Sequence, residues 1–510
     1  MSSLDLAPFL RLIRGTSRWT RKHRDGTSAS TTISSAAQNL PEDLLYTIFL
    51  HTLPSHIRFS TKSIVFNMVT PLNLSWVCRS WRAIVLSRPR LWSEIDILGG
   101  FQTNSKKELK NLITRLQRGI EKWLSLSSLS PLWLHLRIIG DVNHLFPREI
   151  LPLFLSESYR WTSIHIDNDC GIPYRNVRVS QIQAPFTLHF SPEITSLHLQ
   201  LHHQNSPKAI VDLSQLVNGV DSHLGHLSLR SSFSVKLPPL RDALSLPSLF
   251  YLNYAFAGIE EDDHFEKFLC ILRASPQLAV LSLENRGKSD FARTSGHSRD
   301  SVHLPHLFTL FVTVSDLLSN DYFLGVLVCP SLNELSLFVS DLDVVDLNTV
   351  VCASPVLERI HKFLLRQCAG APIRRLSLTF RAFETMSAPT PTLAPALRSL
   401  LGFLDNLKVL ALERFPLTYV VIKMLSISRN EPSQILLCPS LSEISLSPPS
   451  DWKEYNFTEE DIEELVVSRW KSGNLRRVKL EFPLFGALKK RERIAECIRE
   501  GLSTSNALFG

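Results

Sequence analysis

The chain has 510 residues, of which 44% are hydrophobic and 20% are charged, and its formal net charge is +7. This composition is typical of a folded protein and excludes a chain that is disordered throughout. No uncharged apolar run approaches the roughly 18–20 residues of a membrane-spanning helix, so we expect no integral membrane protein. Much of the positive charge lies in residues 1–39, and the near-neutral remainder argues against a nucleic-acid groove across the fold.

Residues 1–39 contain six basic and two acidic residues, and a stretch rich in Ser, Thr and Ala runs from Thr27 to Ala37. We predict a disordered basic tail there, whose role the sequence leaves open. A mitochondrial transit peptide has a similar composition, rich in Arg and Ser and poor in acids. We favour the tail, and a location in the cytoplasm, the nucleus or both, because nothing downstream is typical of an organellar enzyme.

The eight cysteines are scattered, and no two have the C-x-x-C spacing of a zinc ribbon or a thioredoxin-like site. We interpret them as single buried thiols of a protein in a reducing compartment. We therefore expect no metal and no other cofactor.

Residues 40–92 contain the first pattern that indicates ordered structure. Pro41 suits the first position of a helix, and Glu42 and Asp43 would favour its positive end. One apolar face follows at helical spacing, formed by Leu44, Leu45, Ile48 and Phe49. A second apolar segment contains Val77-Cys78-Arg79-Ser80-Trp81-Arg82, Pro89 ends it, and Leu91-Trp92 precedes a strand predicted from Glu94 to Leu98.

These three parts, in this order, resemble the F-box family. The resemblance implies a helical domain over 40–98, with a spacer at 55–70 that is longer than in a compact F-box. It also implies binding to a Skp-family adaptor and, through it, to a cullin. The residues that the resemblance assigns to the adaptor surface are Leu40, Pro41, Leu44, Leu45, Ile48, Val77, Cys78 and Trp81. The alternative is a helical cap without a partner, which we disfavour because large exposed apolar patches usually indicate one.

A short phrase, L-x-x-L-x-L, recurs along the rest of the chain, often with a proline two residues before it. Its copies begin at Trp161, Ile194, Leu224, Leu249, Leu278, Leu307, Leu332, Ile373, Leu407, Leu441 and Leu475. Repetition at this period is typical of a stacked array, in which each phrase is a strand whose last two apolar residues face the core. Helical patterns lie between the copies, at residues 266–272, 355–367 and 462–470, the last with a capping box from Thr458 to Asp461. Strand followed by helix, repeated, predicts an α/β fold with parallel strands on one face and helices on the other.

The repeat resembles an irregular leucine-rich repeat, and we predict a solenoid over 99–510. Together the two parts resemble the F-box and leucine-rich-repeat proteins of basidiomycete fungi. This resemblance implies a substrate receptor of a cullin–RING ubiquitin ligase, in which the repeats hold a target protein whose identity the sequence does not reveal. The alternative is a repeat scaffold that takes no part in ubiquitin transfer.

We find no pattern typical of an enzyme. Gly287-Lys288-Ser289 is like the end of a P-loop, but Ser282 occupies the position of its first glycine. His198 and His202 are four residues apart on a strand-to-loop path, so we favour solvent-facing histidines over a metal site. Lys489-Lys490-Arg491-Glu492-Arg493 fits a solvated helix face better than a nuclear signal.

The outward-facing residues of the repeated strands suggest where a target would bind. The central outward position holds mostly small residues, and Phe311 is the exception, with Tyr251 and Phe338 near it in the flanking positions. Exposed aromatic side chains among polar ones are where binding energy tends to concentrate. The alternative is that these rings only cover a loop or the C-terminal tail. We expect a protein target, with neither nucleic acid nor membrane as a partner.

Overall fold

The computed structural model describes residues 40–52, 56–60, 63–65, 70–101, 105–140, 149–169, 186–189, 193–201, 209–214, 216, 222–231, 233–240, 243–256, 264–285, 301–314, 323–339, 353–367, 372–380, 392–427, 437–447, 456–480, 488 and 491–506. Several sequence features lie outside these residues: the predicted tail at 1–39, Gly287-Lys288-Ser289, His202, Lys489-Lys490, and Cys170, Cys352 and Cys368. The other five cysteines are thiols, and four of them are buried as predicted, whereas Cys78 is partly exposed.

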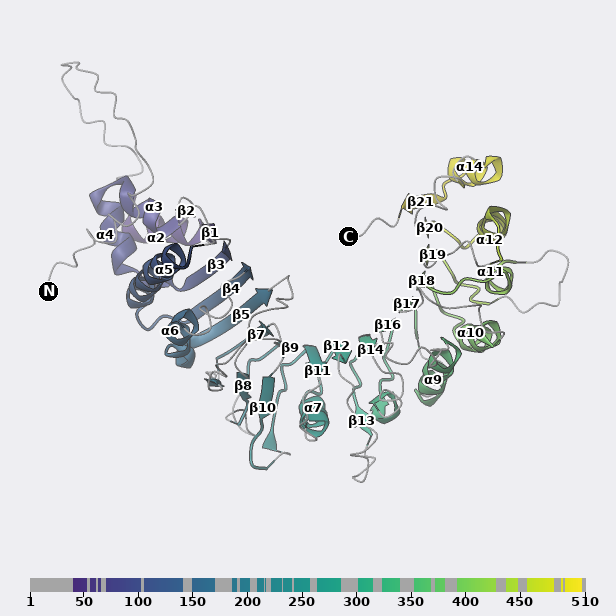
Figure 1. The fold of residues 1–510 in the computed structure, drawn as a ribbon, viewed down its shortest axis with the longest axis horizontal. Coiled ribbons are helices and arrows are strands. Elements are labelled where there is room, and N and C mark those ends of the chain that lie inside the picture. The colour runs from purple at the N-terminus through teal and green to yellow at the C-terminus, as the bar shows by residue number, and fades with distance from the viewer. Residues whose placement is uncertain are drawn as a thin grey trace, which may run out of the picture. The chain divides into compact units, whose positions relative to one another are not determined.

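The chain forms two compact units, Met1–Ser245 and Leu246–Gly510, and both are α/β with a parallel sheet (Figure 1). The α/β class was predicted from the sequence. The boundary between the units falls inside the range 99–510, for which the sequence predicts one array.

The first unit contains a helical segment and a sheet with the strand order β2-β1-β3-β4-β5-β7-β9. Neighbouring strands are parallel, except that β2 is antiparallel to β1. The strands are β1 (His56–Ser60), β2 (Ser63–Val65), β3 (Glu94–Phe101), β4 (Leu132–Gly140), β5 (Trp161–Asp169), β7 (Ser196–Leu201) and β9 (His226–Ser231). The helices are α2 (Glu42–His51), α3 (Thr70–Val77), α4 (Arg79–Ser87), η2 (Pro89–Trp92), α5 (Lys106–Ser127), α6 (Leu151–Leu155) and η4 (Ser158–Arg160).

The spacer predicted at 55–70 contains the strands β1 and β2, and β1 extends the sheet beside β3. The strand predicted from Glu94 to Leu98 continues to Phe101. A second parallel sheet, of order β10-β8-β6, consists of β6 (Phe186–His189), β8 (Ala209–Asp212) and β10 (Phe233–Lys236). It lies on the side of the main sheet that carries α5 and α6 (Figure 1). Because these strands do not carry the repeated phrase, the sequence did not predict them.

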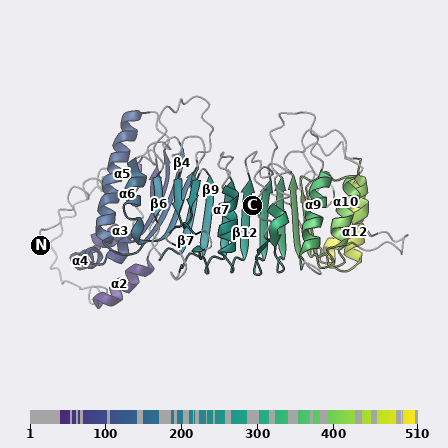
Figure 2. The ribbon, with the colours of Figure 1, turned by 90° about the horizontal axis from the view of Figure 1, so that it is seen from below.

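The second unit has a parallel sheet with the order β11-β12-β14-β16-β17-β18-β19-β20-β21. Its strands are β11 (Tyr251–Phe256), β12 (Val280–Asn285), β14 (Thr309–Val314), β16 (Glu334–Val339), β17 (Arg375–Phe380), β18 (Val409–Glu413), β19 (Glu443–Ser447), β20 (Arg477–Leu480) and β21 (Ser503–Asn506), with β13 (Val302–His303) paired to β15 (Leu327–Val328) beside them. Its helices are α7 (His264–Arg273), α9 (Ala353–Arg366), α10 (Leu393–Gly402), α11 (Tyr419–Leu425), α12 (Glu459–Lys471) and α14 (Glu492–Arg499). These helices lie together on one side of the sheet (Figure 1), and Figure 2 shows strands standing side by side between α7 and α9.

Every copy of the repeated phrase gives a strand, and the copies pair in register. Leu335, for example, aligns with Leu310 on one side and Leu376 on the other, and all three are fully buried. Successive strand residues point to opposite faces, so one face of each strand packs on the helices and the other is open. The pattern along β16 shows this alternation, with Leu335 and Leu337 buried and Ser336 partly exposed.

The proline that precedes many copies lies in a tight turn. In the Cys329-Pro330-Ser331-Leu332 turn, the amide of Leu332 donates to the carbonyl of Cys329 at 3.1 Å. The equivalent bond joins Leu441 to Cys438, also at 3.1 Å. Proline suits the second position of such a turn because its fixed φ matches the turn geometry. The turn brings each chain segment back onto the sheet one strand further along.

The predicted helices are present with small differences in their bounds. The helix expected at 355–367 is α9, and the one at 266–272 is α7. The capping box is confirmed, because Thr458 Oγ1 accepts from the amide of Asp461 while the Asp461 carboxylate accepts from the amide of Thr458 at 2.7 Å. Of the stretch predicted as a solvated helix face, Glu492 and Arg493 are exposed, while Arg491 is partly buried and pairs with Glu459, Glu460 and Glu463, which joins α14 to α12.

Each unit contains a buried arginine whose guanidinium binds backbone carbonyls of neighbouring segments. Arg160 donates to the carbonyl of Ser130 at 2.7 Å and pairs with Glu157 at 2.8 Å. Arg469 donates to the carbonyls of Leu425 at 2.6 Å and Leu437 at 2.8 Å. These groups would otherwise be buried without partners, which is costly. Both arginines therefore hold helix ends and turns together across adjacent repeats.

Candidate functional site

The helix α2 exposes an apolar stripe. Leu44 is 54% exposed and Ile48 is 47% exposed, and Leu40, just before the helix, is also exposed. Leu44 and Ile48 are four apart within the helix, so they lie one above the other on the same side of it, and Leu40 lies four residues before Leu44, just outside the helix. Leu45 and Phe49, which follow Leu44 and Ile48 and lie about 100° further round the helix, are buried. The helix therefore packs on the rest of the segment through one apolar stripe and leaves the adjacent apolar stripe available for a partner.

Two of the adaptor residues implied by the resemblance have different roles from those expected. Leu45 is only 3% exposed and packs inside the helical segment, so it supports the stripe and does not form part of it. Pro41 is the N-cap of α2, with φ −53° and ψ 143°, and the first helical residue is Glu42. Pro41 is itself exposed beside Leu40.

The second predicted segment is two helices, α3 and α4, that meet at Cys78. Cys78 is the N-cap of α4, where its Sγ accepts a hydrogen bond from the amide of Trp81 at 3.4 Å. At the end of α3, Val77 is exposed, and so is its neighbour Trp76. The sequence analysis did not single out Trp76, although a tryptophan beside the Val-Cys-Arg motif was a usable signal.

Contacts between α2 and α4 fix the orientation of the stripe. The rings of Phe49 and Trp81 are 4.8 Å apart, so the partly buried Trp81 is mainly a packing residue. Arg88, after α4, lies 3.1 Å from Asp43 and 3.3 Å from Glu42, and its guanidinium is 5.0 Å from the centre of the Tyr46 ring. The Leu91-Trp92 pair anchors this segment to the rest of the unit, because Trp92 is buried against Trp123 with ring centres 4.9 Å apart.

The open face of the second unit carries the three aromatic residues singled out from the sequence. Phe311 is exposed, and Tyr251 and Phe338 are partly exposed. Phe311 aligns with Ser336 of β16, so Phe338 is a diagonal neighbour on the adjacent strand. Tyr251 lies two strands away on β11, in the row before Phe311. The structure therefore places all three on one face, with Phe311 and Phe338 adjacent and Tyr251 apart from them.

The first unit has a row of histidines at the equivalent position. His135, His165 and His198 align on β4, β5 and β7, next to Asp96 on β3. The His165 and His198 rings stack at 3.9 Å with an angle of 9°, and His135 Nδ1 is 3.2 Å from Asp96 Oδ1. Burial, reinforced by neighbouring histidines, lowers the pKa of His165 to about 4 and that of His198 to about 3. His198, predicted to face solvent, is instead only partly exposed within this stack.

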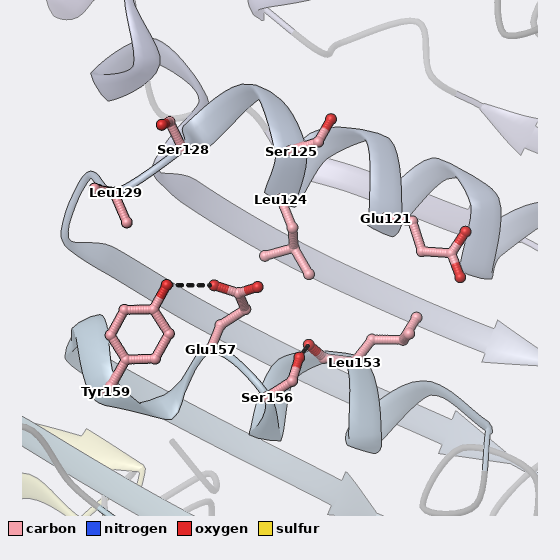
Figure 3. Close-up of a pocket in the computed structure, with 9 residues that line it drawn as sticks. All are labelled: Glu121, Leu124, Ser125, Ser128, Leu129, Leu153, Ser156, Glu157 and Tyr159. Carbon is pink, nitrogen blue, oxygen red and sulfur yellow. Dashed lines mark hydrogen bonds between the residues drawn. The ribbon is translucent and has the colours of Figure 1, made fainter.

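A shallow hollow of about 430 Å³ lies on the helix side of the first unit, between α5 and the segment from α6 to η4 (Figure 3). It is lined by Glu121, Leu124, Ser125, Ser128, Leu129, Leu153, Ser156, Glu157 and Tyr159. Tyr159 donates to the Glu157 carboxylate at 3.3 Å, and that carboxylate also pairs with Arg160. Ser156 donates to the carbonyl of Leu153. Since these groups are already hydrogen-bonded to one another, the hollow offers shape more than reactivity.

In the parts of the chain that the structure describes, no three His, Cys, Asp or Glu residues are grouped so that they could hold a metal ion. None of the described helices combines the length and apolar character needed to cross a membrane. Comparison of the sequence with protein-family models and with curated proteins finds no match. The candidate binding surfaces are the stripe on α2 with Trp76 and Val77, and the open faces of the two sheets.

Proposed function

We propose that this chain is the substrate-recognition subunit of an SCF-type ubiquitin ligase. The helical segment would act as an F-box that binds a Skp-family adaptor and, through it, a cullin. The repeated strands and helices would act as an irregular leucine-rich-repeat solenoid that holds a target protein. The protein would work in the cytoplasm, the nucleus or both.

The observation that carries the proposal is the exposed stripe of Leu40, Leu44 and Ile48, within a motif that resembles the F-box. Exposed apolar groups at a spacing of four residues, on a helix whose adjacent apolar stripe is already buried, match what a partner helix needs for docking. Trp76 and Val77 add a second exposed apolar group to the same helical segment. Their burial in a complex would supply the hydrophobic contribution to binding.

In this proposal the chain contributes placement and no chemical group. A ligase of this kind brings the target's lysines to a ubiquitin-conjugating enzyme, and holding two reactants together can by itself lower a barrier greatly. The target would bind the open faces of the sheets, where Phe311 is exposed and Phe338 and Tyr251 are partly exposed.

The test is the affinity of the full chain for a Skp-family adaptor. In a Leu44→Ala, Ile48→Ala variant we expect the dissociation constant to rise about thirtyfold or more, since truncating central apolar anchors commonly costs about 2 kcal/mol. The matched control is Leu365→Ala, because Leu365 on α9 is 53% exposed, as Leu44 is at 54%. Full affinity in the correctly folded stripe variant would refute the proposal.

The second candidate is a repeat scaffold that binds a partner without ubiquitin transfer. The scaffold would also use the open sheet faces. The two candidates therefore differ only in whether the α2 stripe binds a Skp-family adaptor. Co-purification of both a Skp-family adaptor and a cullin with the chain supports the ligase. Recovery of target proteins without either of them supports the scaffold.

A further inference from the structure

One edge of the second unit's sheet combines exposed aromatic rings with basic side chains. We call it the strand-start rim and define it by Phe250, Phe308, Arg374, Lys408 and Arg476, each of which immediately precedes a strand. Phe250 is 53% and Phe308 is 47% exposed, and the three basic residues are exposed as well.

Backbone hydrogen bonds show that the rim is continuous. The amide of Lys408 donates to the carbonyl of Arg374 at 2.8 Å, and the amide of Arg374 donates to the carbonyl of Asn333 at 2.8 Å. The same bond joins Asn333 to Phe308 at 2.9 Å and Arg476 to Ser442 at 2.8 Å. The rim therefore crosses the sheet in one line, with its aromatic part at β11 to β14 and its basic part at β17 to β20 (Figure 1).

The basic residues of the rim differ from those one position further along. Arg375 and Arg477 lie in the next row and pair with Glu334 at 3.5 Å and Glu443 at 3.3 Å. Arg374, Lys408 and Arg476 form no ion pair with a carboxylate of the described residues. Asp405, which is exposed three residues before Lys408, forms none with it either. Three cations in one row are thus available to a partner.

We infer that the strand-start rim binds an extended acidic segment of a partner protein, with one apolar residue of that segment against Phe308. Adjacent strands are about 4.8 Å apart, so Phe308 and Arg374 are separated by about 10 Å, and Arg374 and Arg476 by about 14 Å. An extended peptide advances about 3.3 Å per residue. The matching segment therefore has its acidic residues about three to seven positions from the apolar one.

The surroundings favour an acidic polypeptide over a nucleic acid. In the next row Glu334 and Glu443 neutralise Arg375 and Arg477, so that row offers no net positive charge to a continuous phosphate backbone, and Ser442 interrupts the cations of the rim. A polypeptide can place its carboxylates only opposite the cations, and such charge complementarity chiefly gives specificity and fast association. As a statement about the target of the ligase, the inference rests on the proposed function, but the binding itself does not require the adaptor.

The experiment measures binding of a fluorescent synthetic peptide to the full chain. The probe carries one phenylalanine followed by glutamates at the matching positions, and its reference has glutamine in place of every glutamate. Arg374→Gln, Lys408→Gln is the rim variant. Lys362→Gln, Arg398→Gln is the matched control, because it removes the same charge from exposed positions on α9 and α10 of the same unit.

We expect the wild type to prefer the glutamate probe, and the rim variant to bind it roughly tenfold more weakly while the control variant changes less than about twofold. Phe308→Ala should weaken both probes alike, because it removes only the apolar contact. Equal loss in the rim and control variants, or no preference for glutamate, overturns the inference. So does displacement of the probe by single-stranded oligonucleotide at lower concentration than by free acidic peptide.

The adaptor assay separates this inference from the proposed function. If the rim variant no longer binds the probe but still binds the adaptor, both the rim inference and the proposed function are supported. If the wild type binds the probe and no Skp-family adaptor, the rim stands as a peptide site and the ligase proposal falls. If it binds the adaptor and not the probe, only the rim inference falls.

Discussion

The two units use the same strand phrase to present different chemistry on their open faces. In the first unit the central outward row reads Asp96, His135, His165, His198 and Ser228. In the second unit the equivalent row reads Asn253, Ser282, Phe311, Ser336, Ser377, Ala411, Ser445 and Lys479. The buried residues on either side of these rows are almost all Leu, Ile or Val. The inward positions therefore specify the fold, while the outward row is left free to differ. It holds adjacent imidazoles in the first unit and one aromatic ring, Phe311, among mostly small residues in the second.

The largest expected effect tests whether the inward positions are equivalent in both units. Leu197→Ala in the first unit and Leu335→Ala in the second should each lower the free energy of unfolding by about 2–5 kcal/mol, because both side chains are buried and would leave a cavity. The controls are Ser282→Ala and Ser336→Ala on the open face, which should change it by less than about 0.5 kcal/mol. Denaturant titration measures all four. A cost for Ser336→Ala equal to that of Leu335→Ala would mean that the faces are wrongly assigned.

The second prediction concerns binding by the aromatic residues of the second unit. A Phe311→Ala, Tyr251→Ala variant should retain its adaptor affinity and capture its target about tenfold or more weakly, since exposed aromatic anchors commonly carry 1–2 kcal/mol or more each. The comparison variant is His165→Asn in the first unit, which should not change capture if the target binds the second unit. Quantitative affinity purification from the native cell measures both. If the proteins captured by the aromatic variant match the wild type in identity and amount, the recognition surface lies elsewhere.

The third prediction concerns pH. The pKa values of His165 and His198 are about 4 and 3 in the folded chain, against 6.5 for a free histidine. Between these values the unfolded chain binds more protons than the folded chain. The contribution of the two histidines to the free energy of unfolding is therefore fully present above about pH 6.5 and is lost as the pH falls towards 4. We expect the melting temperature of the first unit to fall between about pH 7 and pH 5, and to fall less in a His165→Asn, His198→Asn variant.

The reverse substitution sharpens the same comparison. Ser336→His, Ser377→His would place two imidazoles side by side on neighbouring strands of the second unit, where Ser336 and Ser377 align. If stacking and burial of adjacent imidazoles cause the effect, this unit should acquire a similar decrease in melting temperature at low pH. If neither the His165→Asn, His198→Asn variant nor the Ser336→His, Ser377→His variant changes the pH dependence of the melting temperature, the histidine row does not govern the pH response.

The smallest expected effect concerns the charged residues of the second unit's open face. Glu443 pairs with Lys479 at 2.8 Å and with Arg477 at 3.3 Å, and both cations are substantially exposed. Exposed pairs contribute about 0–1 kcal/mol and weaken with salt. Lys479→Ala should therefore change the free energy of unfolding by less than about 0.5 kcal/mol in denaturant titration. A larger loss that persists in high salt would show that Lys479 acts through packing.

The strands could be predicted from the sequence because each phrase places two leucine-like residues at alternate positions, and the register followed because every copy has the same length. The strands β6, β8 and β10 lack the phrase, and β21 is polar throughout, so neither pattern indicated a strand. The histidine row was missed for a different reason. His198 was compared with His202, four residues away, whereas its partner in space is His165, 33 residues earlier, on the neighbouring strand. A site assembled one residue per repeat is visible only after the copies are aligned by register.

The helical segment shows the same limit at the level of single residues. Its two helical regions were predictable from apolar spacing, but Leu44 and Leu45 are adjacent in sequence and have opposite fates, exposed and buried. Spacing alone gives an apolar face without saying where its edges lie. Which apolar residues of the helix are buried depends on the contacts of Phe49 with Trp81 and of Arg88 with Asp43. These contacts join residues that are far apart in the chain. The strand-start rim was missed because its residues occupy the second position of the phrase, whereas the sequence analysis compared only the positions around the last two apolar residues.

The buried arginines have a practical consequence for following motion in solution. Trypsin cleaves after arginine, and it needs an extended, accessible backbone that neither Arg160 nor Arg469 offers while its guanidinium is bound to carbonyls of neighbouring segments. Cleavage at either residue therefore reports local opening, at a rate set by the population of the open form when closing is fast. One of these arginines lies in each unit. A single digestion followed by mass spectrometry therefore compares the populations of the locally open forms of the two units, without a label and without changing the sequence.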